Sequence, residues 1–302
     1  MPHLKPFRQL AALVLGVLLS TTVLAETRTI DSAYGPVQLE GHPQRVVALG
    51  DNALDAALSL GLQPVGTLAS RGGSDVPDYL KAKAGDIALV GTVREPNLEA
   101  VLSLQPDLIL ASTELPRAQY DKLSLIAPTI VPKGGSFQDW RTLFGVYAQA
   151  LGEAAKADER IGEIDARVVA LRKQLPADQQ VSVVRWNPQG PFLMSSRLFV
   201  GQLLEALGFK PNTLATETER PHTDILSLEN LGKADGDWIF LATLNPDGSK
   251  ALDEAREQPA FKRLEAVKND HVVSVDGQIW SSSSGYLAAQ HVLDDVERAL
   301  AD

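Results

Sequence analysis

Arginines at the ends of predicted strands are the residues of this sequence with the most suggestive chemistry. In open α/β sheets, ligands bind at the carboxyl ends of the strands. A guanidinium group forms forked, charge-assisted bonds with anionic oxygens, so arginines gathered at one edge of an acidic chain indicate an anionic ligand. For each arginine taken singly, a solvated surface position is the alternative. The arginines in loops at strand exits are Arg71, Arg117, Arg185, Arg197 and Arg220.

Two tryptophans lie in loops of the same kind. Trp186 follows a predicted strand and Trp280 opens the last loop of the chain. Either ring could cover an apolar face of a ligand or stack under an arginine. Trp140 and Trp238 fall within regular elements, so a place in the core is the favoured interpretation for them.

The sequence lacks the patterns that are typical of enzyme sites. It contains no Gly-x-Ser-x-Gly, no His-Glu-x-x-His and no Gly-x-Gly-x-x-Gly after a strand. The serine run 281–284 could hide a nucleophile, but no histidine or acid is recognisably spaced for it. We therefore predict no catalytic residues, and an exported hydrolase is the less favoured alternative.

Metal binding by the protein itself is not expected either. The chain has no cysteine and only five, scattered histidines, whereas a direct zinc or manganese carrier needs a histidine-rich cluster. We predict no metal ligands and no cofactor. Haem carriage would need an axial ligand at the binding site, for which His222 and Tyr286 are the only candidates.

The segment 91–112 contains the elements that must position such residues. Asn97 is the predicted N-cap of a short amphipathic helix, and Pro106 ends that helix. The run Leu108-Ile109-Leu110 is typical of a strand buried on both faces.

The same design recurs at 224–242, where Ser227 takes the place of Asn97 and Asp237 that of Asp107. A second pair of similar segments, 58–64 and 205–211, occurs in the same order. We interpret these repeats as two similar lobes with mainly parallel sheets flanked by helices. The predicted fold class is therefore α/β, with a ligand cleft between the lobes.

A single long helix is predicted between the two lobes. In 153–175, apolar residues recur at intervals of three and four and form one stripe, and Pro176 ends the pattern. At about 1.5 Å per residue, this helix is roughly 35 Å long and could cross from one lobe to the other. The predicted organisation is a signal peptide over 1–25, an N-terminal lobe over 26–150, an interlobe helix over 151–176 and a C-terminal lobe over 177–302.

The first 25 residues have the pattern of a signal peptide. Lys5 and Arg8 precede an apolar run that is too short to span a membrane, and Val23 and Ala25 fit the cleavage rule. Without a cysteine, lipid attachment at a cysteine is excluded, so we expect a soluble periplasmic protein after cleavage.

The net charge of the whole sequence is −10, and removal of Lys5 and Arg8 with the signal peptide makes the remaining chain two units more acidic. Such a chain is a poor candidate for binding nucleic acid or an anionic membrane.

Several motifs in register resemble the periplasmic iron–siderophore binding proteins of ABC importers, the class with a helical backbone between its lobes. The motifs are RVVALG, LSLGLQPVG, REPNLEAVLSLQPDLIL, SLENL and the QIW…G…AA ending, and they cover almost all of the chain after the signal peptide. The resemblance implies capture of a ferric siderophore or ferric citrate and its delivery to an inner-membrane permease dimer. It implies a monomer that docks at the membrane without inserting. Carriers of cobalamin or haem with the same fold are the alternative, although the arginines argue against a largely neutral ligand.

The resemblance also implies roles for single residues. In the family, one glutamate on each lobe docks against permease arginines, and these positions match Glu99 and Glu229. Arg94 lies in the loop where citrate- and hydroxamate-type relatives often have an arginine, although theirs commonly stands at the position of Val93. Trp280 matches a cleft tryptophan, while the serines 281–284 replace an aromatic residue that often follows it. The leading candidates for ligand contact are Arg94, Arg197 and Arg220, and Arg71 is the next. Trp186 and Trp280 complete the predicted ligand-binding set.

Overall fold

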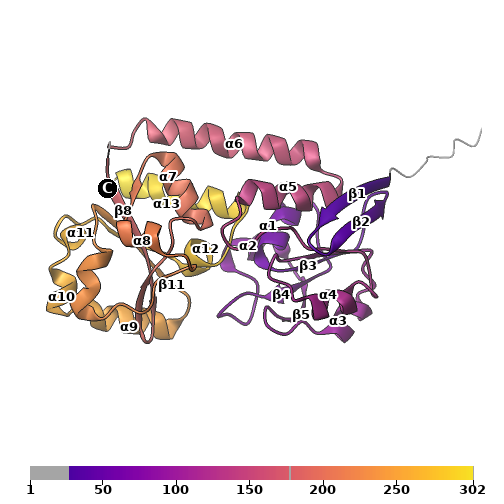
Figure 1. Ribbon diagram of the computed structural model, residues 1–302, viewed down its shortest axis with the longest axis horizontal. Coiled ribbons are helices and arrows are strands. Elements are labelled where there is room, and N and C mark those ends of the chain that lie inside the picture. Colours follow the sequence, from indigo (N-terminus) through magenta and orange to yellow (C-terminus); the bar gives the residue numbers. More distant parts are fainter. Residues whose placement is uncertain (1–26, 177, 302) are drawn as a thin grey trace, which may run out of the picture.

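The computed structural model describes residues 27–176 and 178–301, so the predicted signal peptide lies outside the described residues. The chain begins with an antiparallel hairpin, β1 (Thr27–Ser32) and β2 (Gly35–Glu40), at the edge of the N-terminal lobe (Figure 1). Two five-stranded sheets follow, one in each lobe.

The sheet of the N-terminal lobe is entirely parallel, with the strand order β5-β4-β3-β6-β7. Short apolar strands alternate with short helices, as the sequence predicts. Its strands are β3 (Val46–Leu49), β4 (Gly66–Ala69), β5 (Ala88–Thr92), β6 (Leu108–Ala111) and β7 (Thr129–Ile130). Its helices are α1 (Asp51–Ser59), α2 (Asp78–Ala84), α3 (Leu98–Ser103) and α4 (Arg117–Leu123).

The sheet of the C-terminal lobe has the parallel order β10-β8-β11-β12, with β9 added antiparallel to β8. Its strands are β8 (Gln180–Asn187), β9 (Gly190–Leu193), β10 (Lys210–Pro211), β11 (Trp238–Thr243) and β12 (Val272–Asp276). Its helices are α7 (Phe199–Leu207), α8 (Thr213–Glu217), the 3-10 helix η1 (Leu228–Ala234), α9 (Pro246–Arg256), α10 (Pro259–Lys262), α11 (Glu265–Lys268) and α12 (Gly277–Ser281). Two lobes with mainly parallel sheets confirm the predicted fold class.

The repeated segments occupy equivalent places in the two lobes. The Asp107 carboxylate accepts hydrogen bonds from the backbone N–H groups of Gln44 and Arg45, at 2.7 and 3.0 Å. The Asp237 carboxylate accepts one from the N–H of Gln180, at 2.7 Å. In each lobe, this aspartate precedes a strand (β6 or β11) and binds the start of the parallel neighbouring strand (β3 or β8). The internal repeat read from the sequence is therefore also a structural repeat.

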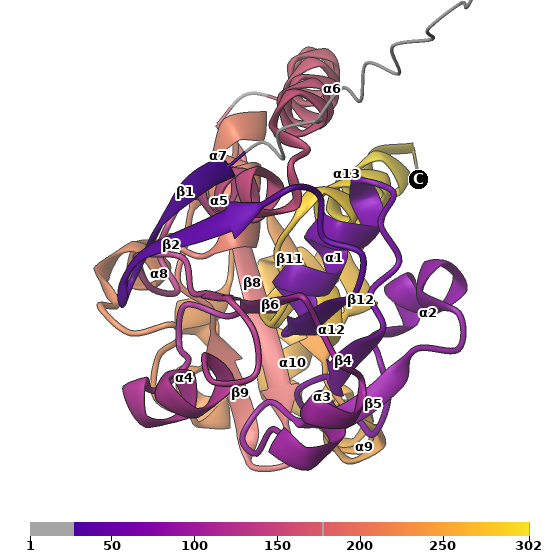
Figure 2. The same cartoon turned by 90° about the vertical axis from the view of Figure 1, so that its right-hand side faces the viewer.

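Three helices lie along the junction of the lobes. Helix α5 (Trp140–Leu151) leads into α6 (Ala154–Arg172), which runs over both lobes at the top of Figure 1. Its 19 residues span roughly 28 Å at about 1.5 Å per residue. The last helix, α13 (Tyr286–Ala301), packs against α6 and also against α1 of the N-terminal lobe, as the view at right angles shows (Figure 2). The boundaries at 150 and 176 stay predictions, because the last helix of the predicted C-terminal lobe contacts the other lobe.

The hydrophobic core is continuous across this junction. One cluster joins buried residues of both lobes, among them Leu54 and Tyr147 on one side and Phe199 and Phe240 on the other. The apolar stripe of α6 contributes Ile164, Val168 and Leu171. Continuous packing of this kind favours limited motion of the lobes over a wide swing.

Local details differ from the sequence-based expectations at three points. Asn97 caps α3 as predicted, but Ser227 forms no side-chain cap at η1. Arg185 and Trp186 lie within β8 rather than in a loop after it. Trp280 lies in the short helix α12 rather than in a loop. All three positions lie at element ends, where assignments from sequence are weakest because side-chain caps depend on surrounding contacts.

Candidate ligand-binding cleft

A cleft of about 500 Å³ lies between the two lobes, at the carboxyl ends of the central strands. The N-terminal lobe contributes the loops after β3, β4, β5 and β6, and the C-terminal lobe contributes β8, the start of α7 and the loop between α12 and α13. This is the position that the topology of parallel sheets favours for a ligand. Its polar lining residues include Asp51, Asn52, Arg71, Arg94, Glu114, Gln119, Gln138, Arg185, His222 and Ser281 to Ser284.

Two arginines reach the cleft from the N-terminal lobe. Arg71 follows β4, and its guanidinium lies 3.8 Å from the carboxylate of Glu114, with both side chains largely exposed. Arg94 follows β5 and is also exposed. The carbonyl of Arg71 accepts a hydrogen bond of 2.8 Å from Nε2 of Gln278, so its loop contacts the opposite lobe. The Arg71 side chain therefore belongs to a loop that is held at the lobe junction.

Arg185 reaches the cleft from the C-terminal lobe. Its side chain projects from β8, is only 8% exposed and lies over the ring of Phe192, with Cζ 5.3 Å from the ring centroid. Burial, and then the charge of Arg71, lower the pKa of Arg185. Its Nε has no hydrogen-bond partner among the described residues. A buried guanidinium with a free donor is well suited to bind an anionic group.

The loop between α12 and α13 adds hydroxyl groups to the cleft. Ser281 to Ser284 line it, and the Oγ atoms of Ser282 and Ser283 are buried without a partner in the described chain. Buried hydroxyls are costly when they are left unpaired, so a ligand or ordered water is expected to bind them. The sequence singled out this run as a departure from relatives and as a possible nucleophile, but not as a source of ligand-binding hydroxyls.

Asp51 and His222 also face the cleft. Asp51 is 8% exposed, and burial raises its pKa to about 6 although the charge of Arg71 opposes the shift. The ring of His222 packs on Phe192 at a centroid distance of 4.5 Å, and its Nδ1 lies 2.7 Å from the carbonyl of Thr223. Within 27–176 and 178–301, no group of three or more acidic, histidine or cysteine side chains could hold a metal ion.

The structure brings only some of the predicted ligand residues to this cleft. Arg71, Arg94 and Trp280 line it. Arg197 and Arg220 do not, because Arg197 lies over the ring of Phe137 at 4.2 Å and Arg220 forms an exposed ion pair with Asp224 at 2.8 Å. A ligand role for any of these residues stays a prediction.

The two tryptophans differ from the expectation in exposure. Trp186 is 3% exposed and packs edge-on against Phe261 in a hydrophobic cluster of the C-terminal lobe, away from the cleft lining. Trp280 is 1% exposed, stacks on Phe240 at 4.3 Å and donates its indole N–H to Asp295 at 2.7 Å. Its ring therefore forms the base of the cleft rather than a free stacking surface.

Sequence reasoning missed Arg185 and Asp51 as principal candidates. Both residues were visible at strand exits. The sequence shows that Arg185 and Trp186 are adjacent, but it does not show which of the two side chains points to the cleft. On a strand, neighbouring side chains point to opposite faces, so Arg185 and Trp186 cannot both reach it.

The predicted docking glutamates lie outside the cleft. Glu99 is in the first turn of α3 and Glu229 in the first turn of η1, and both are exposed. Neither forms an ion pair with another residue of the described chain. Their carboxylates are therefore available to a partner.

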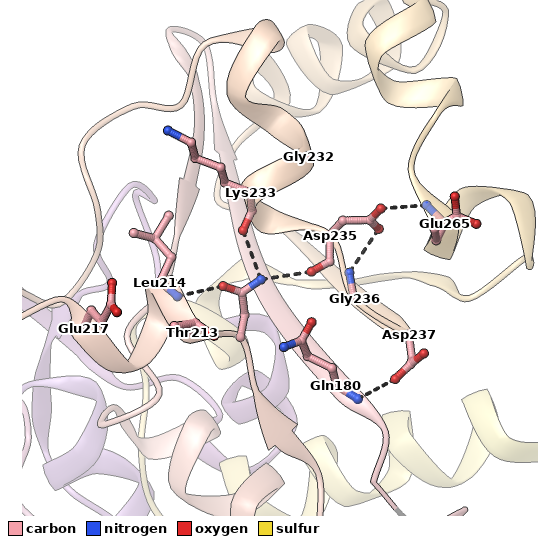
Figure 3. A pocket seen from close by; sticks show the side chains of 11 residues that line it. Gln180, Thr213, Leu214, Glu217, Gly232, Lys233, Asp235, Gly236, Asp237 and Glu265 are labelled. Carbon is pink, nitrogen blue, oxygen red and sulfur yellow. Dashed lines mark hydrogen bonds between the residues drawn. The ribbon is translucent and has the colours of Figure 1, made fainter.

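A second hollow, of about 570 Å³, is lined by residues of the C-terminal lobe alone (Figure 3). Its polar groups bind one another: the Asn212 amide donates to the carbonyls of Lys233 and Asp235, and the Asp235 carboxylate accepts from the N–H of Glu265. These contacts support the turn before β11, and we assign this hollow no ligand.

Comparison with known proteins places the chain among binding proteins. It is 32% identical over 285 residues to the probable siderophore-binding lipoprotein YfiY of Bacillus subtilis (strain 168), which covers 90% of this chain and 87% of that protein. It is also 32% identical over 275 residues to the Fe(3+)-citrate-binding protein YfmC of the same organism, with 90% and 85% covered. The crystal structure of Staphylococcus aureus SirA complexed with staphyloferrin B matches with a TM-score of 0.79 at 30% identity, covering 91% of this chain and 99% of that one.

Nothing in the described ranges resembles a membrane-crossing helix, since none of their helices combines the required length and apolar character.

Residues 46–279 match the model of a family described as periplasmic binding protein, whose members bind substrates and are not enzymes. This match covers more than half of the sequence, and it agrees with the two relatives and with the two-lobed fold. The chain therefore belongs to the periplasmic binding protein family.

Proposed function

We propose that this protein captures a ferric siderophore or ferric citrate in the cleft between its lobes and delivers it to an ABC importer of the inner membrane. The observation that supports this most directly is the convergence of Arg71, Arg94 and Arg185, from three separate loops and strands, on one cleft. Guanidinium groups suit the carboxylate and other anionic oxygens of such chelates. The names of the relatives, a siderophore-binding and a Fe(3+)-citrate-binding protein, point to the same class of ligand.

The iron is the cargo and arrives already coordinated by the chelator. The protein accordingly needs anion-binding groups around the chelate rather than ligands to the metal. Cobalamin is a poorer candidate because it is largely neutral. Haem is also less favoured, since Tyr286 is 6% exposed with its hydroxyl bound to the Glu163 carboxylate, and the ring of His222 packs on Phe192.

Delivery is proposed to use Glu99 and Glu229. Both are exposed at the start of a short helix, and they stand at corresponding places in the repeated segments of the two lobes. Exposed ion pairs contribute only about 0.2–1 kcal/mol each, so they suit a carrier that must dock in register and leave again. The partner would be a permease dimer, with the carrier acting as a monomer.

The proposed location is the periplasm, in soluble form after removal of the signal peptide. YfiY is named a lipoprotein, whereas this sequence contains no cysteine to which a lipid could be attached. Detection of the processed protein in the periplasmic fraction without detergent would support this location, and recovery only with the membrane fraction would contradict it.

A thermal-shift panel tests the ligand class directly. The chelates are ferric citrate, a ferric hydroxamate, a ferric catecholate, haem and cobalamin. A native ligand present at a hundredfold excess over its Kd stabilises the folded protein by about 2.7 kcal/mol, which is readily seen. We expect one of the ferric chelates to give the largest shift; a shift with cobalamin or haem alone would overturn the proposal.

A further inference from the structure

Asp51 is a buried acid at the wall of the cleft with no partner of its own. It is the first residue of α1, is 8% exposed and lines the cleft together with Arg71 and Arg185. Within the described parts of the chain, its carboxylate accepts no hydrogen bond and forms no ion pair; burial raises its pKa and the charge of Arg71 opposes the shift. The Asp51 oxygens are not among the enclosed side-chain atoms without a partner, so they reach the open cleft, where a bound group would contact them.

Asp55, one turn later on the same helix, is by contrast a buried acid whose two oxygens both accept hydrogen bonds. Its two oxygens accept the backbone N–H groups of Leu287 and Ala288, at 3.0 and 2.9 Å. Asp55 therefore serves the fold, whereas Asp51 faces the cleft with its hydrogen-bonding capacity unused.

The charged groups around Asp51 determine whether a bound anion would favour the protonated or the ionised form of its carboxyl. The charged and titratable groups that line the cleft with it, or interact with it electrostatically from α2, are Arg71, Arg94, Arg185, Glu114, His222 and Tyr79. An anionic ligand held by the arginines would bring its negative charge close to the Asp51 carboxylate. Like charges at short range in a poorly solvated site favour protonation of one of them.

We propose that Asp51 contacts the bound chelate in its protonated form, donating its carboxyl proton in a hydrogen bond to an anionic oxygen, so that capture of the ligand takes up one proton from solvent. This inference rests on the proposed function and adds a specificity residue to it. A protonated Asp51 binds more strongly to a ligand that has an anionic acceptor at this point, and it disfavours a ligand that offers only apolar surface there.

The coupling between ligand binding and protonation of Asp51 determines how the affinity for the ligand depends on pH. In the free protein the pKa of Asp51 is about 6, and the bound anion raises it further. Below the free value the acid is protonated in both states, and the affinity does not depend on this group. Between the free and the bound pKa values, the affinity falls by up to about tenfold per pH unit as the pH rises.

The test is isothermal titration of ferric citrate and of an anionic ferric catecholate into the full processed protein. Each titration is performed in two buffers of different ionisation enthalpy, from pH 5.5 to 8. The difference between wild type and Asp51→Asn isolates the proton of Asp51, because protons from the chelate and from all other groups of the protein cancel. We expect wild type to take up close to one proton more than the variant at pH 7 to 7.5. The variant should bind at pH 7.5 at least as tightly as wild type, with a flatter pH profile.

The matched control is Glu114→Gln, which removes a carboxylate from the same cleft but an exposed one that pairs with Arg71. It should keep the extra proton uptake of wild type. Equal proton counts in wild type and Asp51→Asn would overturn the inference, and so would a variant that binds more weakly at every pH. Binding of a neutral ferric hydroxamate alone would overturn the inference but leave the proposed function standing; binding of no ferric chelate would remove both.

Discussion

Asp55 and Ala288 are joined by a hydrogen bond that connects the first helix of the N-terminal lobe to the last helix of the chain. Oδ2 of Asp55 accepts the Ala288 N–H at 2.9 Å, and Oδ1 accepts the Leu287 N–H at 3.0 Å. The first N–H groups of a helix have no partner within it, and here a fully buried carboxylate of the other lobe satisfies two of them. This contact holds the end of the serine loop that lines the cleft.

Gly285 is the residue that permits this contact. Its φ is +143°, and a Cβ added to it would lie 2.5 Å from Cγ and Oδ1 of Asp55. We predict that Gly285→Ala lowers the free energy of unfolding by about 1–3 kcal/mol, through backbone strain and loss of the two hydrogen bonds. Urea denaturation measures this change. Gly162→Ala on α6, where an added Cβ meets nothing within 4 Å, is the control and should be neutral or stabilising.

Asp55 should also make stability depend on pH. Burial raises its pKa to about 7, although the N–H groups of Ala288 and Leu287 oppose the shift. The folded state therefore binds more protons than the unfolded state between pH 4 and 7, so the contribution of this group to stability decreases as the pH rises through that range. We expect the urea midpoint to fall less between pH 5 and 7.5 in Asp55→Asn than in wild type. An equal or larger fall in the variant would contradict this assignment.

Arg185 should contribute more to ligand affinity than an exposed arginine at a strand exit. Its guanidinium is buried at the cleft and has a free donor, and a hydrogen bond to a charged group is worth about 1.5–3 kcal/mol. We predict that Arg185→Ala weakens binding of the ferric chelate by about 10- to 100-fold. Arg117→Ala is the control, because Arg117 pairs with Asp121 and does not line the cleft. Similar losses in the two variants would argue against the cleft as the binding site.

The double substitution Glu99→Arg with Glu229→Arg separates binding from delivery. Both side chains are exposed and lie outside the cleft, so the Kd for the chelate should not change. Uptake of iron from the chelate by cells should be abolished, because under the proposed docking like charges then face arginines of the permease. The charge-matched control is Glu159→Arg with Glu254→Arg, on the exposed sides of α6 and α9. Normal transport by the first double variant would falsify the docking proposal.

Trp280 is expected to act through stability more than through ligand contact. Its indole N–H donates to Asp295, and burial raises the pKa of that carboxyl. Trp280→Phe keeps an aromatic ring on Phe240 but removes the donor, so we predict a loss of about 1–3 kcal/mol in the free energy of unfolding. The Kd for the chelate should change by less than about threefold, since the ring is 1% exposed. A large loss of affinity with unchanged stability would instead assign the ring to the ligand.

Much of the fold could be predicted because its signals are local. Unbroken apolar runs such as Leu108 to Leu110 become strands buried on both faces, and the cap at Asn97 forms as its side chain suggests. The repeat of Asp107 at Asp237 identified equivalent positions in two lobes 130 residues apart. These features depend on neighbours in the sequence and on the pattern of burial, which the amino-acid types largely determine.

The sequence by itself determined the α/β class, the two lobes, the linking helix and an acidic chain with arginines at strand exits. Only the tertiary structure decided which of those arginines meet. Arg185 and Trp186 are adjacent, yet the alternation of β8 directs one to the cleft and the other to the core. Arg197 and Arg220 bind neighbours on their own surface, and Asp51 becomes a cleft acid because distant segments bury it. Such outcomes depend on contacts between residues far apart in the chain, which no local pattern specifies.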